Sequence, residues 1–464
     1  MRTPLLLLVA LLAISACSAH RTAGPAAAPS EYKGFHRIEV LEPVAGLSIY
    51  HYRNDASGLE LLVSPKPGTG TVAIVTAYEV GARFELNGRT GLAHLFEHMM
   101  FRGTEHFPKP FETLSDWGGR FNAYTTPDLT VYHELVPKER FNDALDFESE
   151  RMRKLRLTPE VFDTERGAVV SERKMRTEDS PSGRLFWELY QFAYDRHPYK
   201  TAPIGWQKDL DATKFQDALD FYNRFYAPNR AVVSLVGDLT VSEALEQMDR
   251  YYGSMTRSSF EEPAIAVEPA RQGIRRKVVP MKTESVILAD AIFGATYNDP
   301  NAATDSLIAS LLADDKLGYL SDQLVERGLA RGVGSDAGAN IDPGLSIVLV
   351  TGNPGVPVAR LEQAYDSARK KFPSWLTAER LDNFKLYYLA EQWESMRDPM
   401  HLAEGMAAAH AATGNAAWDF QFLARVQKVT LEEIRERLKY WDTSARTRVI
   451  LTPAARNAPL ERSK

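Results

Sequence analysis

The 464-residue chain contains one cysteine, Cys17, so it can form no intrachain disulfide and offers no set of cysteines for a metal site. The apolar run from Leu5 to Ile14 is only ten residues long, which is too short to span a bilayer. The formal net charge is −6, and no basic run is interleaved with aromatic residues. The composition therefore gives no support for nucleic-acid binding, and it is ordinary for a globular protein with a large core.

The N-terminus has the pattern of a targeting segment. Arg2 precedes the apolar run, which ends in Ile-Ser-Ala followed by Cys17, an order that resembles the bacterial lipobox. We expect residues 1–16 to be a signal peptide, Cys17 to carry a lipid, and residues 17–30, rich in small residues and proline, to form a flexible tether. Ser18 after the cysteine favours an outer-membrane lipoprotein facing the periplasm of a Gram-negative cell.

The most informative motif is HLFEH, which contains His94, Glu97 and His98. On a helix, the two histidines lie one turn apart on one face, with the glutamate beside them. Two imidazole nitrogens and a carboxylate are the groups that a catalytic zinc site uses, and the HxxEH order is an inverted zinc-peptidase motif. The segment is otherwise largely apolar, so its polar side chains need partners. The motif indicates a zinc site, whereas solvated histidines on a surface helix are the alternative.

A third protein ligand has to come from elsewhere in the chain. Thr158 and Pro159 form a helix N-cap and first-turn pair, so we predict a helix from this point. Glu165 and Glu172 are seven residues apart and share one face of that helix. One carboxylate could bind zinc while the other orients a ligand histidine, although an ordinary charged helix face has the same pattern.

The chain resembles the pitrilysin/insulinase family of zinc peptidases, which includes mitochondrial processing peptidase. The HxxEH motif and the stretches FRGTEHFP, ERGAVVSERKM, HPYKTAPIGWQKDL and LVERGLA occur in family order, and Glu172 lies 74 residues after His98. The resemblance implies one zinc per chain, with His94, His98 and Glu172 as ligands. It also implies that Glu165 supports a ligand histidine and that Glu97 is the base that activates water. Such a site could also take cobalt or manganese.

Strand-like and helix-like segments alternate irregularly, which favours an α+β fold. Together with the resemblance, this predicts two homologous halves, each an antiparallel sheet packed with helices. We expect a zinc-binding peptidase domain over residues 31–256, a linker over 257–273 and a C-terminal domain without a metal site over 274–464.

An internal repeat supports the two halves. The segment around Thr158 aligns with that around Thr377, which places Glu391 opposite Glu172 but Phe384 opposite Glu165. The region opposite His94 has no histidine pair. Only the first half can therefore build this site, and we interpret Glu391 as a structural remnant.

The resemblance also assigns a substrate-binding strand. Asn122, Ala123 and Tyr124 would lie on a sheet edge that pairs with the backbone of a peptide substrate. A plain sheet edge is the alternative interpretation of such a run.

One departure from the family concerns the second half. Active single-chain members usually carry an arginine and a tyrosine seven residues apart, and this chain has Leu324 and Arg331 at those positions. The resemblance therefore suggests a heterodimer with a zinc-less family member that supplies the arginine and tyrosine. Arg331 could still provide a positive charge, but it cannot copy the geometry of tyrosine.

Two classes of function follow. The first is a zinc metalloendopeptidase that hydrolyses peptides or unfolded polypeptides at the bacterial cell envelope. The second is a non-catalytic or assembly subunit of a peptidase-like complex. The intact set of His94, Glu97, His98 and Glu172 favours the first, because a purely structural relative tends to lose it.

Overall fold

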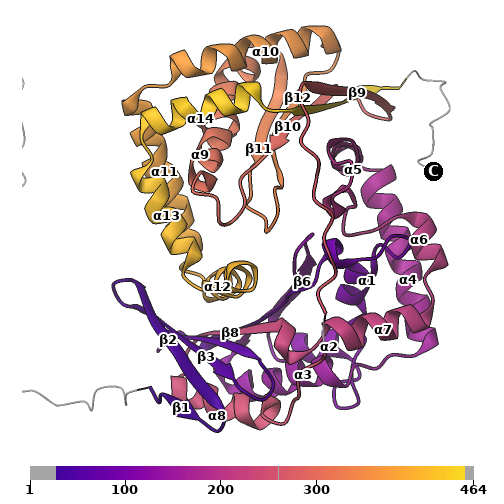
Figure 1. The fold of residues 1–464 in the computed structure, drawn as a ribbon, viewed down its shortest axis with the longest axis vertical. Coiled ribbons are helices and arrows are strands. Elements are labelled where there is room, and N and C mark those ends of the chain that lie inside the picture. Colours follow the sequence, from indigo (N-terminus) through magenta and orange to yellow (C-terminus); the bar gives the residue numbers. More distant parts are fainter. Residues whose placement is uncertain (1–27, 260, 455–464) are drawn as a thin grey trace, which may run out of the picture.

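The computed structural model describes residues 28–259 and 261–454, which form two halves, each a sheet packed with helices (Figure 1). This confirms the predicted α+β class. The N-terminal segment that includes Cys17 lies outside the described residues. The first half contains β1 (Glu31–Tyr32), β2 (Phe35–Val44), β3 (Leu47–Asn54), β4 (Glu60–Pro65), β5 (Thr71–Tyr78), α1 (Leu92–Met99), α2 (Pro110–Asp116), β6 (Arg120–Thr125), β7 (Thr130–Pro137), α3 (Phe141–Arg153), α4 (Pro159–Arg173), α5 (Pro181–Ala193), α6 (Gln207–Ala212), α7 (Phe215–Phe225), β8 (Ala231–Gly237) and α8 (Val241–Tyr252).

The second half begins after a stretch in which the described residues from 256 to 273 form no helix or strand. Its elements are β9 (Ile274–Met281), β10 (Ile287–Phe293), α9 (Ala302–Ala313), a π-helical turn (Ser321–Val325), β11 (Ala330–Asp336), β12 (Leu345–Gly352), α10 (Val358–Trp375), α11 (Ala378–Ser395), α12 (Pro399–Thr413), α13 (Trp418–Lys428), α14 (Leu431–Thr443) and β13 (Arg446–Pro453).

The two sheets are mostly antiparallel, with one parallel pair in each. The strand order is β1-β2-β3-β4-β8-β5-β7-β6 in the first sheet and β11-β12-β10-β13-β9 in the second. Strands β4 and β8 are parallel, and so are β9 and β13. The predicted antiparallel pairing therefore holds for the other strand pairs of both sheets, and these two pairs depart from it. Each parallel pair joins strands far apart in the sequence, and the intervening helices provide the long crossover that parallel pairing requires.

Both faces of the first sheet are covered. Along β4, Leu61 and Val63 belong to the core that contains α1, α3 and α7, whereas Leu62 points to the opposite face. That opposite face packs against α12 of the second half, through residues that include Leu402, Ala403 and Met406. Burial on both faces explains why these strands are almost continuously apolar.

The second sheet is covered in the reciprocal way. Leu185, Leu189 and Ala193 of α5, a helix of the first half, pack against Val449 and Leu451 of β13. One helix of each half therefore packs on the sheet of the other half. In Figure 1, α12 lies at the junction of the halves. The exchange fixes the position of the second half relative to the first.

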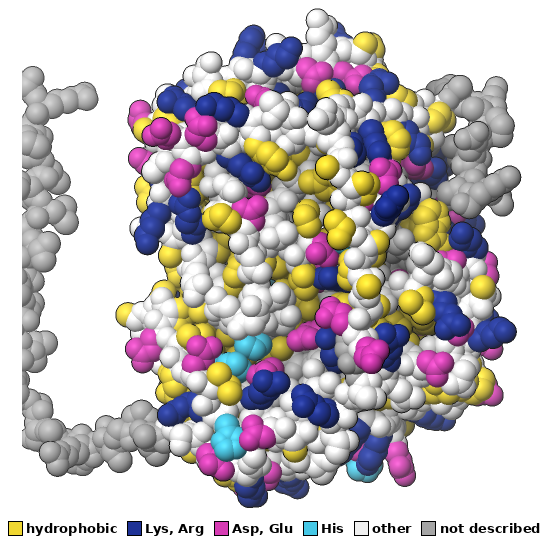
Figure 2. Space-filling view, viewed as in Figure 1, with side chains coloured by type: hydrophobic (Ala, Val, Ile, Leu, Met, Phe, Trp, Pro, Cys, Tyr) yellow, Lys and Arg dark blue, Asp and Glu magenta, His cyan; other side chains and the backbone are white. Residues whose placement is uncertain are grey.

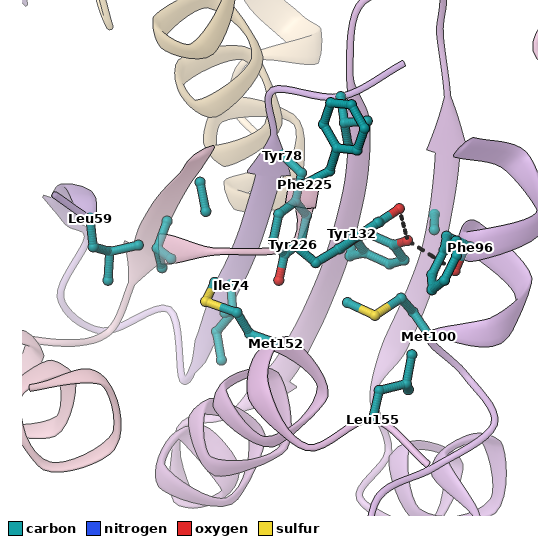
Figure 3. Packing of buried hydrophobic residues seen from close by; sticks show 14 of the residues in the cluster. Leu59, Ile74, Tyr78, Phe96, Met100, Tyr132, Met152, Leu155, Phe225 and Tyr226 are labelled. Carbon is teal, nitrogen blue, oxygen red and sulfur yellow. Dashed lines mark hydrogen bonds between the residues drawn. The ribbon is translucent and has the colours of Figure 1, made fainter. Parts of the chain in front are cut away.

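A buried charge cluster packs against Tyr132, which in turn is hydrogen-bonded to α1. The Arg151 guanidinium lies 4.4 Å from the ring centroid of Tyr132, donates to Glu134 at 3.0 Å and pairs with Glu148. The Tyr132 hydroxyl in turn donates to the carbonyl of Phe96 in α1 at 3.3 Å (Figure 3). Arg151, Glu134 and Glu148 are fully buried, so none of these charges has water as an alternative partner.

Replacing Arg151 with methionine should lower the free energy of unfolding by about 3–5 kcal/mol, because two carboxylates would stay buried without their cation. Urea denaturation of the two proteins measures the change. Arg153→Met is the matched control on the same helix, since the Arg153 side chain is 33% exposed and lies 3.5 Å from Glu150. Its loss should cost less than about 1 kcal/mol. Equal destabilisation by both changes would show that the buried Arg151 cluster contributes no more to stability than the partly exposed Arg153 pair.

Candidate metal centre

The HLFEH motif forms α1, as predicted, and the helix begins at a constrained position. Gly91 has a φ of 93°, and a Cβ added there would lie 3.0 Å from the Ile204 carbonyl oxygen. The Glu85 carboxylate accepts hydrogen bonds from the backbone N–H groups of Gly91 and Ala93, both at 2.8 Å. Glu85 thus satisfies N–H groups at the start of α1 that have no partner within the helix. Sequence reasoning missed Glu85, although an acidic residue ahead of a helix is a recognisable signal.

The helix α4 brings Glu172 to the two histidines of α1. Thr158 caps α4 as predicted, its hydroxyl oxygen accepting from the Val161 N–H at 3.2 Å. Glu172 Oε2 lies 3.1 Å from His98 Nε2 and 3.7 Å from His94 Nε2. The three potential ligand atoms all lie within 4.8 Å of one another.

The spacing and chemistry of this trio fit a zinc ion. Ligand atoms at 2.0–2.1 Å from a tetrahedral zinc are separated by about 3.3 Å, which lies between the two observed distances. Two imidazoles and a carboxylate are a donor set that catalytic zinc sites use. His94 is almost fully buried, and its Nδ1 has no hydrogen-bond partner among the described residues.

Glu165 lies behind the trio rather than in it. Its carboxylate accepts a hydrogen bond from Arg102 Nη2 at 2.9 Å and forms an ion pair with Arg102 Nε at 2.7 Å, and its Oε2 is 3.7 Å from His98 Nδ1. A carboxylate on the far ring nitrogen fixes which nitrogen of a histidine faces a metal. Glu172 has a comparable support, because its Oε1 lies 2.7 Å from Arg176 Nη2.

Glu97 lies in the same helix as the two histidines, and a hydrogen bond anchors its side chain to β6. The Thr125 hydroxyl donates to Glu97 Oε2 at 2.5 Å. Burial raises the pKa of Glu97, although the hydrogen bond from Thr125 opposes that rise. A carboxylate with a raised pKa holds a proton more readily, which is what a general base has to do during turnover.

The substrate-binding candidates lie at the edge of the same cleft. Among the described residues, strand β6 pairs with β7 alone and forms one edge of the first sheet. A cleft of about 650 Å³ is lined by Asn122, Ala123, Tyr124, His94 and Glu97, with further walls from α5. The structure therefore brings the proposed base, one proposed ligand and the proposed peptide-binding strand to one cavity.

The histidines differ in their readiness to bind a metal. Burial, together with the neighbouring His98, lowers the pKa of His94 to about 4, so its ring is neutral at pH 7. For His98, burial alone would lower the pKa. The hydrogen bonds to Glu165 and Glu172 have a larger effect in the opposite direction, so the pKa of His98 is raised to about 9. Without a metal, His98 therefore carries a proton at neutral pH.

The second half has no equivalent site among the described residues. Glu391, opposite Glu172 in the repeat, is exposed on α11 and pairs with Lys316 at 3.2 Å. Phe384, opposite Glu165, is buried in the core of the second half. None of the described groups that could hold a metal lies wholly in this half.

The positions where family members carry arginine and tyrosine are occupied differently here. Leu324 is buried in the core of the second half, so it presents no side chain to the cleft. Arg331 is exposed on β11, which is an edge strand of the second sheet.

Comparisons with known proteins agree with this geometry. The family description "Insulinase (Peptidase family M16)" matches residues 61–205, and "Peptidase M16 inactive domain" matches residues 214–385. The zinc protease PqqE of Helicobacter pylori is 28% identical over 412 residues, which cover 86% of this chain and 91% of that protein.

Two solved structures show the same fold. A protease from Helicobacter pylori superposes with a TM-score of 0.80 at 25% identity and covers 86% of this chain and 98% of its own. The periplasmic protease PqqL from Escherichia coli superposes with a TM-score of 0.72 at 19% identity over 90% of this chain and 48% of its own.

The proton on His98 predicts a pH dependence of metal binding. A metal has to displace this proton below pH 9, so the apparent zinc affinity of the metal-free protein should rise about tenfold per pH unit between pH 7 and 9. Zinc titration against a competing chelator at several pH values measures the slope. His94 contributes no slope in this range because its ring is already neutral. A flat profile would contradict the assignment of His98 as a ligand.

Proposed function

The chain belongs to the insulinase family of peptidases, family M16, and on that premise we propose that it is a zinc metalloendopeptidase whose active site lies in its first half. The observation that carries the proposal is the convergence of His94, His98 and Glu172, with Glu97 beside them at the same cleft. A relative of the chain is named a zinc protease, which supports zinc as the metal.

His94, His98 and Glu172 would hold the ion, and Glu165 would keep the His98 ring in the orientation that directs Nε2 inward. A bound zinc supplies Lewis-acid chemistry, which polarises the carbonyl of the scissile bond and makes water more acidic. Glu97 takes a proton from the attacking water and returns it to the leaving amine. The Thr125 hydroxyl holds the Glu97 carboxylate in place and ties it to the strand that would bind the substrate.

The substrate would bind as an added strand on β6. The free edge of β6 offers backbone N–H and C=O groups beside Asn122, Ala123 and Tyr124. Pairing of this kind reads the main chain of the substrate, so it favours extended peptides and unfolded polypeptides over folded domains. The backbone of the peptide would then run along the cleft that contains Glu97.

A second subunit would complete the transition-state contacts. Leu324 is buried and Arg331 lies on an edge strand, so the chain has no arginine and tyrosine pair of the family type. We infer a heterodimer with a zinc-less family member that provides both residues. Such donors stabilise the oxyanion that forms during hydrolysis.

The protein would act at the cell envelope. The leader and Cys17 are the sequence features that support a lipid anchor, and a protein with the same fold, PqqL, is periplasmic. Among the described residues, every helix is too short or too polar to cross a membrane.

Two isosteric variants separate metal binding from catalysis. Glu172→Gln should weaken binding of the catalytic zinc by at least about tenfold, because the amide carries no charge for the cation. Glu97→Gln should keep that zinc but lower peptide hydrolysis by about 100-fold or more, because the amide cannot accept the proton. Metal analysis and cleavage of a fluorogenic peptide measure the two effects.

Glu391→Gln is the matched control, since this glutamate occupies the equivalent place in the second half and is exposed. It should leave zinc content and activity unchanged. Undiminished hydrolysis by Glu97→Gln would refute the assigned base. If the wild-type chain retains zinc but neither it nor its complex hydrolyses any peptide, the chain is a non-catalytic assembly subunit instead.

The partner proposal predicts weak activity of the isolated chain. Addition of a zinc-less family member that carries the arginine and tyrosine should raise kcat/KM at least about tenfold, as is typical of an added oxyanion donor. Replacing the tyrosine of that partner with phenylalanine should remove most of the gain. Equal rates with and without the partner would show that the chain is self-sufficient.

A further inference from the structure

A second group of metal-binding side chains lies where the two halves meet. His51 is in β3 and Glu60 is in the neighbouring β4, whereas His410 is near the C-terminal end of α12 from the second half. In the register of these strands, His51 faces Leu62, so Glu60 is its diagonal neighbour on the same side of the sheet. This side is the one that α12 covers.

The geometry of this group resembles that of the catalytic trio. Glu60 Oε2 lies 2.6 Å from His51 Nε2 and 4.0 Å from His410 Nε2, and all three potential ligand atoms lie within 4.8 Å of one another. The two imidazole rings are edge to face with centroids 4.5 Å apart. The corresponding carboxylate distances in the catalytic trio are 3.1 and 3.7 Å.

Burial and supporting contacts also follow the pattern of a metal site. His51 and His410 are only 6% and 7% exposed. The carboxylate of Glu39 lies 3.4 Å from His51 Nδ1, on the ring nitrogen that faces away from Glu60. A carboxylate at that place keeps the other nitrogen directed at the site, as ligand histidines require. The Glu60 side chain is 20% exposed, which leaves a path from solvent.

A simple ion pair accounts for only one of the two histidines. His51 and Glu60 can pair with each other, but the side chain of His410 makes no hydrogen bond to any described residue, and its buried Nδ1 has no partner. Burial, with His51 nearby, lowers the pKa of His410 to about 4, so its ring is neutral, which is the form that binds metals. A buried polar ring without partners is costly unless something else bonds to it.

We propose that His51, Glu60 and His410 form a second divalent-metal site, which takes Zn²⁺ or a similar borderline ion. Two imidazoles and one carboxylate are the donor set that such ions favour. The site is distinct from the catalytic one, because the sheet lies between them: Leu61 faces the core with α1, whereas Leu62 faces α12. An ion here joins two strands of the first half to a helix of the second.

The site would therefore act on the assembly of the two halves. A metal that binds only when α12 is docked on the sheet stabilises the docked arrangement by mass action. Helix α12 also contacts β7, the partner strand of β6, so it packs against the strand pair whose edge borders the cleft. The second ion would thus be structural, and it would raise the metal content of the active protein to two per chain.

The test removes the catalytic site first. His94→Ala/His98→Ala in the full chain, stripped of metal and titrated with Zn²⁺ against a chromophoric chelator, should still bind one ion and unfold at a higher temperature once loaded. With Co²⁺ in place of Zn²⁺, it should show the visible absorption bands of low-coordinate cobalt. Binding of no ion by this double variant overturns the proposal.

Further changes in the double variant assign the ligands. Either His410→Gln or Glu60→Gln should abolish the binding, the cobalt bands and the thermal shift. His401→Gln is the matched control, because His401 is an exposed histidine on the same helix, and it should keep all three. Retention of the ion after both ligand changes would overturn the assignment. Because the catalytic histidines are absent throughout, these results do not depend on the proposed peptidase activity.

Discussion

The candidate metal centre depends on one contact between two helices. The carboxylate of Glu172, on α4, lies between two imidazoles that α1 carries, at 3.1 Å from His98 and 3.7 Å from His94. Neither helix can shift by a turn without separating these groups. Glu85 caps the start of α1, Tyr132 ties α1 to β7 through the Phe96 carbonyl, and Thr158 caps α4, so each of these bonds fixes one of the two helices.

Besides the metal ligands, the fold has to position the strand that would bind the substrate. A peptidase of this type needs a free strand edge at a fixed distance from its base, and the Thr125 hydroxyl connects β6 to Glu97 directly. The cleft also needs a second wall that keeps its position. The exchange of α5 and α12 connects the two halves rigidly, so that the second half can serve as this wall. Figure 2 shows positive and negative side chains interspersed over the visible face, without a large patch of one sign that would select a charged partner.

Sequence reasoning reached the local parts of this arrangement. The helical spacing of His94 and His98 and the Thr158 cap are written in short segments, so α1 and α4 could be predicted from the chain alone. The role of Glu172 came from the resemblance to a family, since spacing left Glu165 as an equal candidate. The parallel pairing of β8 with β4 and of β9 with β13 was missed, because strand direction follows from crossovers that no local pattern records.

The proximity of His51 and His410 also could not be predicted from the sequence. These residues belong to different halves, and only the docking of α12 on the outer face of the first sheet brings them together. Isolated histidines in a strand and in an alanine-rich helix give no signal of a shared site. Glu85 is a different case, because its partners lie six and eight residues away and its acidic side chain ahead of α1 was a local signal that could have been used.

We propose that His94, His98 and Glu172 hold a catalytic zinc. The most direct measurement is a crystal structure of the zinc-loaded protein with anomalous data collected on both sides of the zinc absorption edge. We predict an anomalous peak at about 2.0–2.2 Å from His94 Nε2, His98 Nε2 and Glu172 Oε2. Absence of a peak between α1 and α4 in protein shown to contain zinc would contradict the account.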